Sequence, residues 1–144
     1  MNWRWILMLA TLGVLVSLAS IMGWIPSSMW LTAGLVLVVA ALLGHNVKDK
    51  LFLHGFLTAV IWTLIGGALQ FAFWDTFMAN NPEVQEKMAK VPEGMNIRPF
   101  MAIGIVVGGA IWGAVLGLLT MLAGKLLGEK PQAEPVSQDQ TPES

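Results

Sequence analysis

Three long apolar runs dominate this chain, and none of them contains Asp, Glu, Lys or Arg. The runs cover residues 5–47, 51–74 and 99–124, so every charged side chain lies outside them. A helix that crosses the roughly 30 Å hydrocarbon core of a bilayer needs about 20 predominantly apolar residues. The pattern therefore predicts an all-α integral membrane protein.

The first run is long enough for two such helices, and Pro26 lies near its middle in the segment Gly-Trp-Ile-Pro-Ser-Ser. Proline has no backbone donor and disfavours a helical conformation in the residue before it. We therefore expect a tight turn at this point. The chain then forms a four-helix transmembrane bundle over residues 1–128, with spans at residues 5–24, 27–44, 51–74 and 99–124.

The start of the chain permits a second interpretation. Arg4 precedes an apolar stretch and the segment Ser-Leu-Ala-Ser at residues 17–20, which is the layout of a secretory signal peptide. The apolar core of a signal peptide usually has about 7–15 residues, whereas this stretch continues to Ile25. We therefore favour a retained first span over a cleaved one.

The loop at residues 75–98 is the largest polar segment between the runs. It contains the dipeptide Asn81-Pro82, and these residues are typical of the N-cap and the first position of a helix. Apolar residues follow at positions 84, 88 and 91, which is helical spacing. The loop is therefore expected to hold a short amphipathic helix.

The tail at residues 129–144 is rich in Pro, Gln, Glu and Ser. It has too little apolar surface to offset the entropy of ordering, so we expect it to be disordered. Five of the eight Lys and Arg residues would share the side of the two termini in a four-span topology. Since such residues are enriched in cytoplasmic loops, both termini are expected in the cytoplasm, with the protein in a bacterial inner membrane.

Small residues recur at helical spacing in the first and last runs: Gly13, Ser17, Gly104, Gly108, Gly109, Gly113 and Gly117. Small side chains let two helix backbones approach closely, which strengthens dispersion contacts where lipid removes the hydrophobic driving force. The pattern predicts helix packing. It leaves open whether the packing lies inside one bundle or between copies of the chain in a homo-oligomer.

Four polar residues are candidates for specific contacts: His54, Gln70, Asp75 and Arg98. An amide such as that of Gln70 needs a hydrogen-bond partner in lipid, so it should bond a neighbouring helix or contact a solute. His54 begins the third run and forms an i, i+4 polar pair with Thr58. Asp75 would cap the start of the loop or pair with Arg98, which is placed on the same side of the membrane, and in both cases it would anchor the loop.

The sequence contains no cysteine, no catalytic or phosphate-binding motif and no histidine pair at metal-ligand spacing. The spans also lack the acidic and basic residues that ion-coupled transporters carry. We therefore expect a non-enzymatic protein without cofactor or metal, which acts as a scaffold, accessory subunit or modulator through glycine-mediated helix packing.

The alternative function is a small channel or transporter subunit for a neutral or hydrophobic solute, working as an oligomer. The expected partners are the lipid bilayer and either further copies of the chain or another membrane protein. A net charge of −1 provides no basic surface for nucleic acid.

Overall fold

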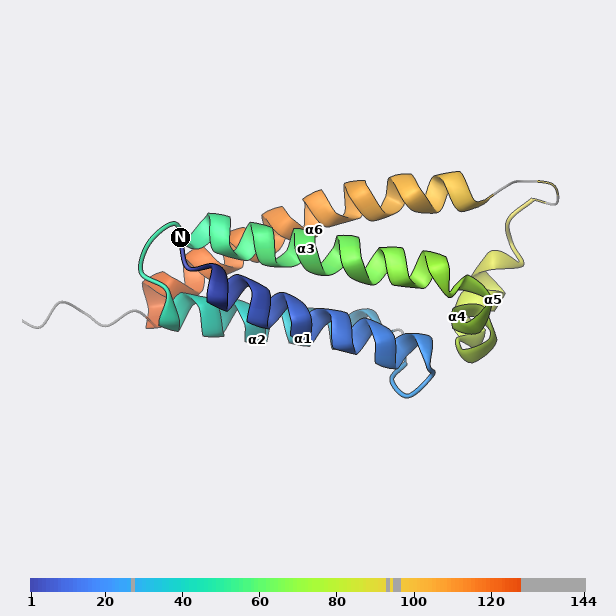
Figure 1. The fold of residues 1–144 in the computed structure, drawn as a ribbon, viewed down its shortest axis with the longest axis horizontal. Helices are drawn as coiled ribbons and strands as arrows, with labels where there is room; N and C mark the ends of the chain where they lie inside the picture. Colours follow the sequence, from blue (N-terminus) through green and yellow to red (C-terminus); the bar gives the residue numbers. More distant parts are fainter. Residues whose placement is uncertain (27, 93, 95–96, 128–144) are drawn as a thin grey trace, which may run out of the picture.

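The long apolar runs fold into helices in the structure, a computed structural model that describes residues 1–26, 28–92, 94 and 97–127 (Figure 1). The helices are α1 (Trp3–Ile21), α2 (Met29–Asn46), α3 (Leu51–Ala72), α4 (Trp74–Asn80), α5 (Pro82–Met88) and α6 (Ile97–Leu127). Among these residues, four helices are long and apolar enough to cross a membrane, namely α1, α2, α3 and α6.

The first apolar run is divided into two helices at the predicted turn. Gly23 has a φ of 74°, in the left-handed region that glycine adopts without steric cost, and its N–H donates to the carbonyl of Ser20. Pro26 follows this turn, and α2 begins at Met29. The prediction of two helices in this run is confirmed.

The ends of the long helices differ from the expected ends by a few residues. Helix α3 ends at Ala72, before the expected end at residue 74, because Phe73 leaves the helical conformation and α4 begins directly after it. Helix α6 continues past residue 124 to Leu127. The expected start of the second span, residue 27, and the expected disordered tail, residues 129–144, lie outside the described residues.

The loop between α3 and α6 holds two short helices, α4 and α5, where one was expected. Helix α5 begins at Pro82 as predicted, but the side chain of Asn81 makes no cap hydrogen bond to it. The Asn81 amide donates instead to the carbonyls of Ser20 and Phe77, at 3.0 and 2.8 Å. No residue of α5 is buried, and its amphipathic character stays a prediction.

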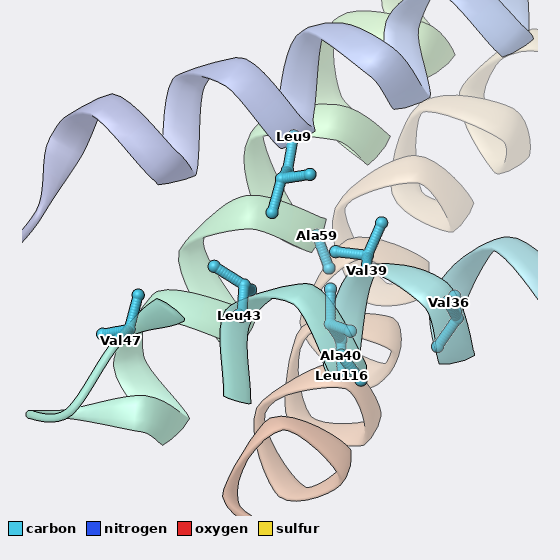
Figure 2. Packing of buried hydrophobic residues seen from close by; sticks show 8 residues of the cluster. All are labelled: Leu9, Val36, Val39, Ala40, Leu43, Val47, Ala59 and Leu116. Carbon is cyan, nitrogen blue, oxygen red and sulfur yellow. The ribbon is translucent and has the colours of Figure 1, made fainter. Parts of the chain in front are cut away.

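Helix α3 packs along both α1 and α6, and α2 packs mainly against α6. The start of α1 and the end of α6 lie at the same end of the molecule, opposite to α4 and α5 (Figure 1). Figure 2 shows the largest buried apolar cluster, to which all four long helices contribute: Leu9, Val36, Val39, Ala40, Leu43, Val47, Ala59 and Leu116.

Helix α6 crosses the bundle obliquely. Its C-terminal part lies beside α2, and its N-terminal part runs along α3 and away from α1 and α2 (Figure 1). The molecule therefore has two different halves. We call the half that contains Leu9, Leu43 and Leu116 the terminal half, and the half next to α4 and α5, with Ser17 and Gln70, the loop half.

Candidate functional site

A cavity of about 420 Å³ lies in the loop half and is bordered by all four long helices. We call it the crevice. Its walls come from α3 between Ala59 and Gln70 and from α6 between Met101 and Trp112, with further residues from α1 and α2. No charged side chain of the described residues lines it. Its volume falls in the range of roughly 300–1,000 Å³ that is usual for ligand pockets.

Glycines of α6 open one wall of the crevice. A Cβ atom on Gly104 or Gly108 would meet no heavy atom within 4 Å among the described residues. Both glycines line the crevice. These two members of the predicted packing set therefore face open space within one chain.

The other predicted glycines of α6 lie against α3. A Cβ atom on Gly113 would lie 2.9 Å from the ring of Phe56, and one on Gly117 would lie 2.8 Å from the backbone oxygen of Phe52. At Gly109 the nearest atoms belong to the side chain of Thr63, at 3.5 Å. This face of α6 is thus occupied inside the chain by large side chains and backbone of α3.

Two close helix contacts were missed in the sequence, at Gly55 and Gly44. A Cβ atom on Gly55 would lie 2.9 Å from the Cα of Gly117, so the backbones of α3 and α6 touch here. A Cβ atom on Gly44 would lie 2.6 Å from the backbone nitrogen of Gly124, where α2 meets α6. The spacing of Gly55 and Ala59, four residues apart, was a signal for the first contact.

The predicted small residues of α1 hold an indole of α3. Gly13 lies against the ring of Trp62, with no space for a Cβ atom. The Trp62 Nε1–H donates to Oγ of Ser17 at 3.3 Å, and the Ser17 hydroxyl donates to the carbonyl of Gly13 at 3.0 Å. This role of Trp62 was not predicted, because an indole in mid-span is usually apolar bulk.

Gln70 lines the crevice at its end near α4 and is half-buried. Within the described residues no hydrogen bond of its side chain is formed. Thr32 lines the α2 side, and its hydroxyl donates to the carbonyl of Ser28 at 3.2 Å. Among the described residues that line the crevice, Gln70 and Thr63 therefore have polar side-chain groups that are left to bond a ligand.

The other candidate polar residues lie away from the crevice. His54 is 1% exposed; its Nε2 accepts from the backbone N–H of Asn2 at 2.8 Å, and its Nδ1 lies 3.0 Å from the carbonyl of Lys50. A proton on Nδ1 satisfies both bonds. Asp75 is exposed in the first turn of α4. The side chain of Arg98 lies outside the described residues, and so does its expected pairing with Asp75.

The crevice offers an uncharged, mostly apolar concavity with hydroxyl, indole and amide groups. Across the described ranges, no group of three or more His, Cys, Asp or Glu residues is placed to hold a metal ion. Comparisons of this chain with protein-family models, curated proteins and solved structures find no match.

Proposed function

We propose that this chain is an integral protein of a bacterial inner membrane, folded as a four-helix transmembrane bundle with both termini in the cytoplasm. The outward faces of its long helices support the membrane location, because large apolar side chains cover them. Leu15, Ile103 and Leu118 are 56%, 62% and 56% exposed, which is costly in water and favourable in lipid. The Lys and Arg distribution supports the orientation.

Within the membrane the protein acts without catalysis, as a scaffold, accessory subunit or modulator that contacts a second membrane protein or a second copy. The observation that carries this proposal is the outer face of α6. Ile103, Val107 and Ile111 follow one another at four-residue steps and are 62%, 50% and 59% exposed. They form an apolar ridge of the kind that packs into the grooves of another helix.

Single cysteines test this proposal cleanly, because the chain has none of its own. Val107→Cys on the α6 ridge should give disulfide-linked dimers in native membranes, or photo-crosslinks to one other protein when it carries a bifunctional label. Leu15→Cys, on the outer face of α1, is the matched control and should give neither. Absence of any adduct at Val107, or equal adducts at both positions, would contradict the packing role.

A second candidate function, passage of a neutral or hydrophobic solute through an oligomer, is favoured by the crevice itself. In one chain the terminal half is filled, since Leu43 and Leu116 are fully buried. A continuous path would therefore need surfaces from several chains. Solute flux into liposomes that hold purified protein would support this function over the packing role.

A further inference from the structure

The crevice of the loop half is long and narrow. Its walls on α3 and α6, from Ala59 to Gln70 and from Met101 to Trp112, each extend about 16 Å at the helical rise of 1.5 Å per residue. This is about half of the roughly 30 Å hydrocarbon thickness of a bilayer, or one leaflet.

The width of the crevice restricts what can occupy it. A volume of about 420 Å³ spread over this length corresponds to a mean width of roughly 6–9 Å, below the 10–12 Å diameter of a helix with its side chains. The crevice is partly open, so the side chains of a partner helix could enter it, but the whole helix could not lie inside it. A single hydrocarbon chain is narrow enough.

In the deep part of the crevice, the polar groups of Ser17 and Trp62 are already hydrogen-bonded. The Ser17 hydroxyl donates to Gly13 and accepts from the Trp62 indole, so each satisfies the other. The rings of Trp62 and Trp112, together with Val36, then present apolar surface. Apart from the single hydroxyl of Thr63, this part of the crevice suits methylene groups, and it excludes a charged ligand because no counter-charge lines it.

The end near α4 differs, because the Gln70 amide lies there with no hydrogen-bond partner among the described residues. From these observations we propose that the crevice binds one acyl chain of a bilayer phospholipid, with the ester group of that chain beside Gln70. The chain fills space that would otherwise leave the lining residues without dispersion contacts. This binding site goes beyond the packing role and does not depend on it.

Photo-crosslinking in nanodiscs tests the proposal with the full chain. The probe is a phosphatidylcholine that carries a diazirine in one acyl chain, mixed with the unlabelled lipid, and mass spectrometry locates the adducts. We expect enrichment on the crevice side, at Trp62, Met101 and Ile105, over the outward-facing Leu15 and Val106. A second arm with Gln70→Leu should shift the adducts along the crevice, since the ester group loses its partner.

A pair of matched glycine substitutions gives the control. Gly108→Leu fills the crevice, whereas Gly34→Leu adds the same side chain at an exposed position of α2 outside it, and a Cβ atom meets nothing within 4 Å at either site. We expect crevice adducts to fall about fivefold or more in Gly108→Leu and to stay unchanged in Gly34→Leu. If Gly108→Leu aggregates, Gly104→Leu provides the same test.

Adducts spread evenly over all lipid-facing residues, or an equal loss in both glycine variants, would overturn the proposal. Crevice adducts that form in nanodiscs holding one copy of the chain and disappear in nanodiscs holding two would show that protein, and not lipid, occupies the crevice. These outcomes are separate from the test of the packing role, because the nanodisc contains purified chain alone. Failure of the Val107→Cys experiment would leave the lipid result standing.

Discussion

The glycines of α6 have opposite surroundings in the two halves of the bundle. In the terminal half, Gly55 and Gly117 bring the backbones of α3 and α6 into contact, and the ring of Phe56 covers Gly113. In the loop half, Gly104 and Gly108 face the crevice with nothing over them among the described residues. A glycine produces close packing only where the facing helix supplies a surface that reaches it.

The facing residues explain why the halves differ. Large side chains of α3 cover the α6 glycines in the terminal half, and the fully buried Leu116 of α6 packs there in the apolar cluster with Leu9 and Leu43. In the loop half, Gly66 and Gly67 of α3 are covered by Ser17 of α1 and by Ile105 of α6, whereas nothing of the described residues reaches Gly104 and Gly108. The two uncovered glycines of α6 leave part of the crevice wall without a facing side chain.

The largest expected effect comes from adding volume to the terminal half. Gly117→Leu would place a Cβ atom 2.8 Å from the backbone oxygen of Phe52, and a backbone atom moves only if α3 moves. We expect a loss of at least about 3 kcal/mol in unfolding free energy, the upper part of the overpacking range, or no folded protein. Thermal unfolding in detergent, followed by circular dichroism, measures it.

The matched variant in the loop half is Gly104→Leu, whose added side chain enters open space. It should change the unfolding free energy by no more than about 0.5 kcal/mol, as an unobstructed surface change does. If both variants lost the same stability, the contrast between an occupied and an open glycine face would be wrong.

How much of this arrangement the sequence could predict depends on the type of signal. The four long helices and the break near Pro26 follow from charge-free length and turn chemistry, which act locally. The residue that faces each glycine cannot be predicted from such local signals, because it depends on how α6 crosses the bundle. Gly109 and Gly108 are neighbours in sequence, yet one contacts Thr63 and the other faces the crevice.

The polar contacts were harder to predict for the same reason. Asn81 looked like a helix N-cap from the following proline, but its amide bonds the end of α1, far away in sequence. The bond between Trp62 and Ser17 also joins residues that are distant along the chain. Gln70 was recognisable as a polar group in a span, although its position in a crevice required the placement of four helices.

A smaller effect is expected from Asn81→Ala, which tests the hydrogen bonds that join the end of α1 to the loop after α4. Asn81 is 5% exposed, and its amide bonds the carbonyls of Ser20 and Phe77. Its removal takes one donor from the Phe77 carbonyl, while the Ser20 carbonyl keeps the N–H of Gly23, so we expect a cost at the lower end of about 1–3 kcal/mol. Hydrogen exchange should rise at the end of α1 and in α4, and stay unchanged in the terminal half.

Gln85→Ala is the control for this variant, since the Gln85 amide also bonds a backbone carbonyl, that of Met78, but at an exposed site. It should leave exchange at the end of α1 unchanged. Faster exchange throughout the bundle in Asn81→Ala would mean that the two halves unfold as one unit. The terminal half and the loop half would then differ in how they are packed but not in how stable they are.

The smallest effect is expected at the exposed surface of the loop, where Glu86 and Lys90 form an ion pair. The Lys90 Nζ lies 3.5 Å from Glu86 Oε1, and the Lys90 and Glu86 side chains are 73% and 76% exposed. Water screens such a pair, so Glu86→Gln should cost no more than about 0.5 kcal/mol at low salt, and added salt should reduce this cost further. Thermal unfolding at low and high salt measures both. A larger loss of stability would show that the segment with Glu86 and Lys90 is packed in the membrane. The loop at residues 75–98 would then cover the end of the loop half.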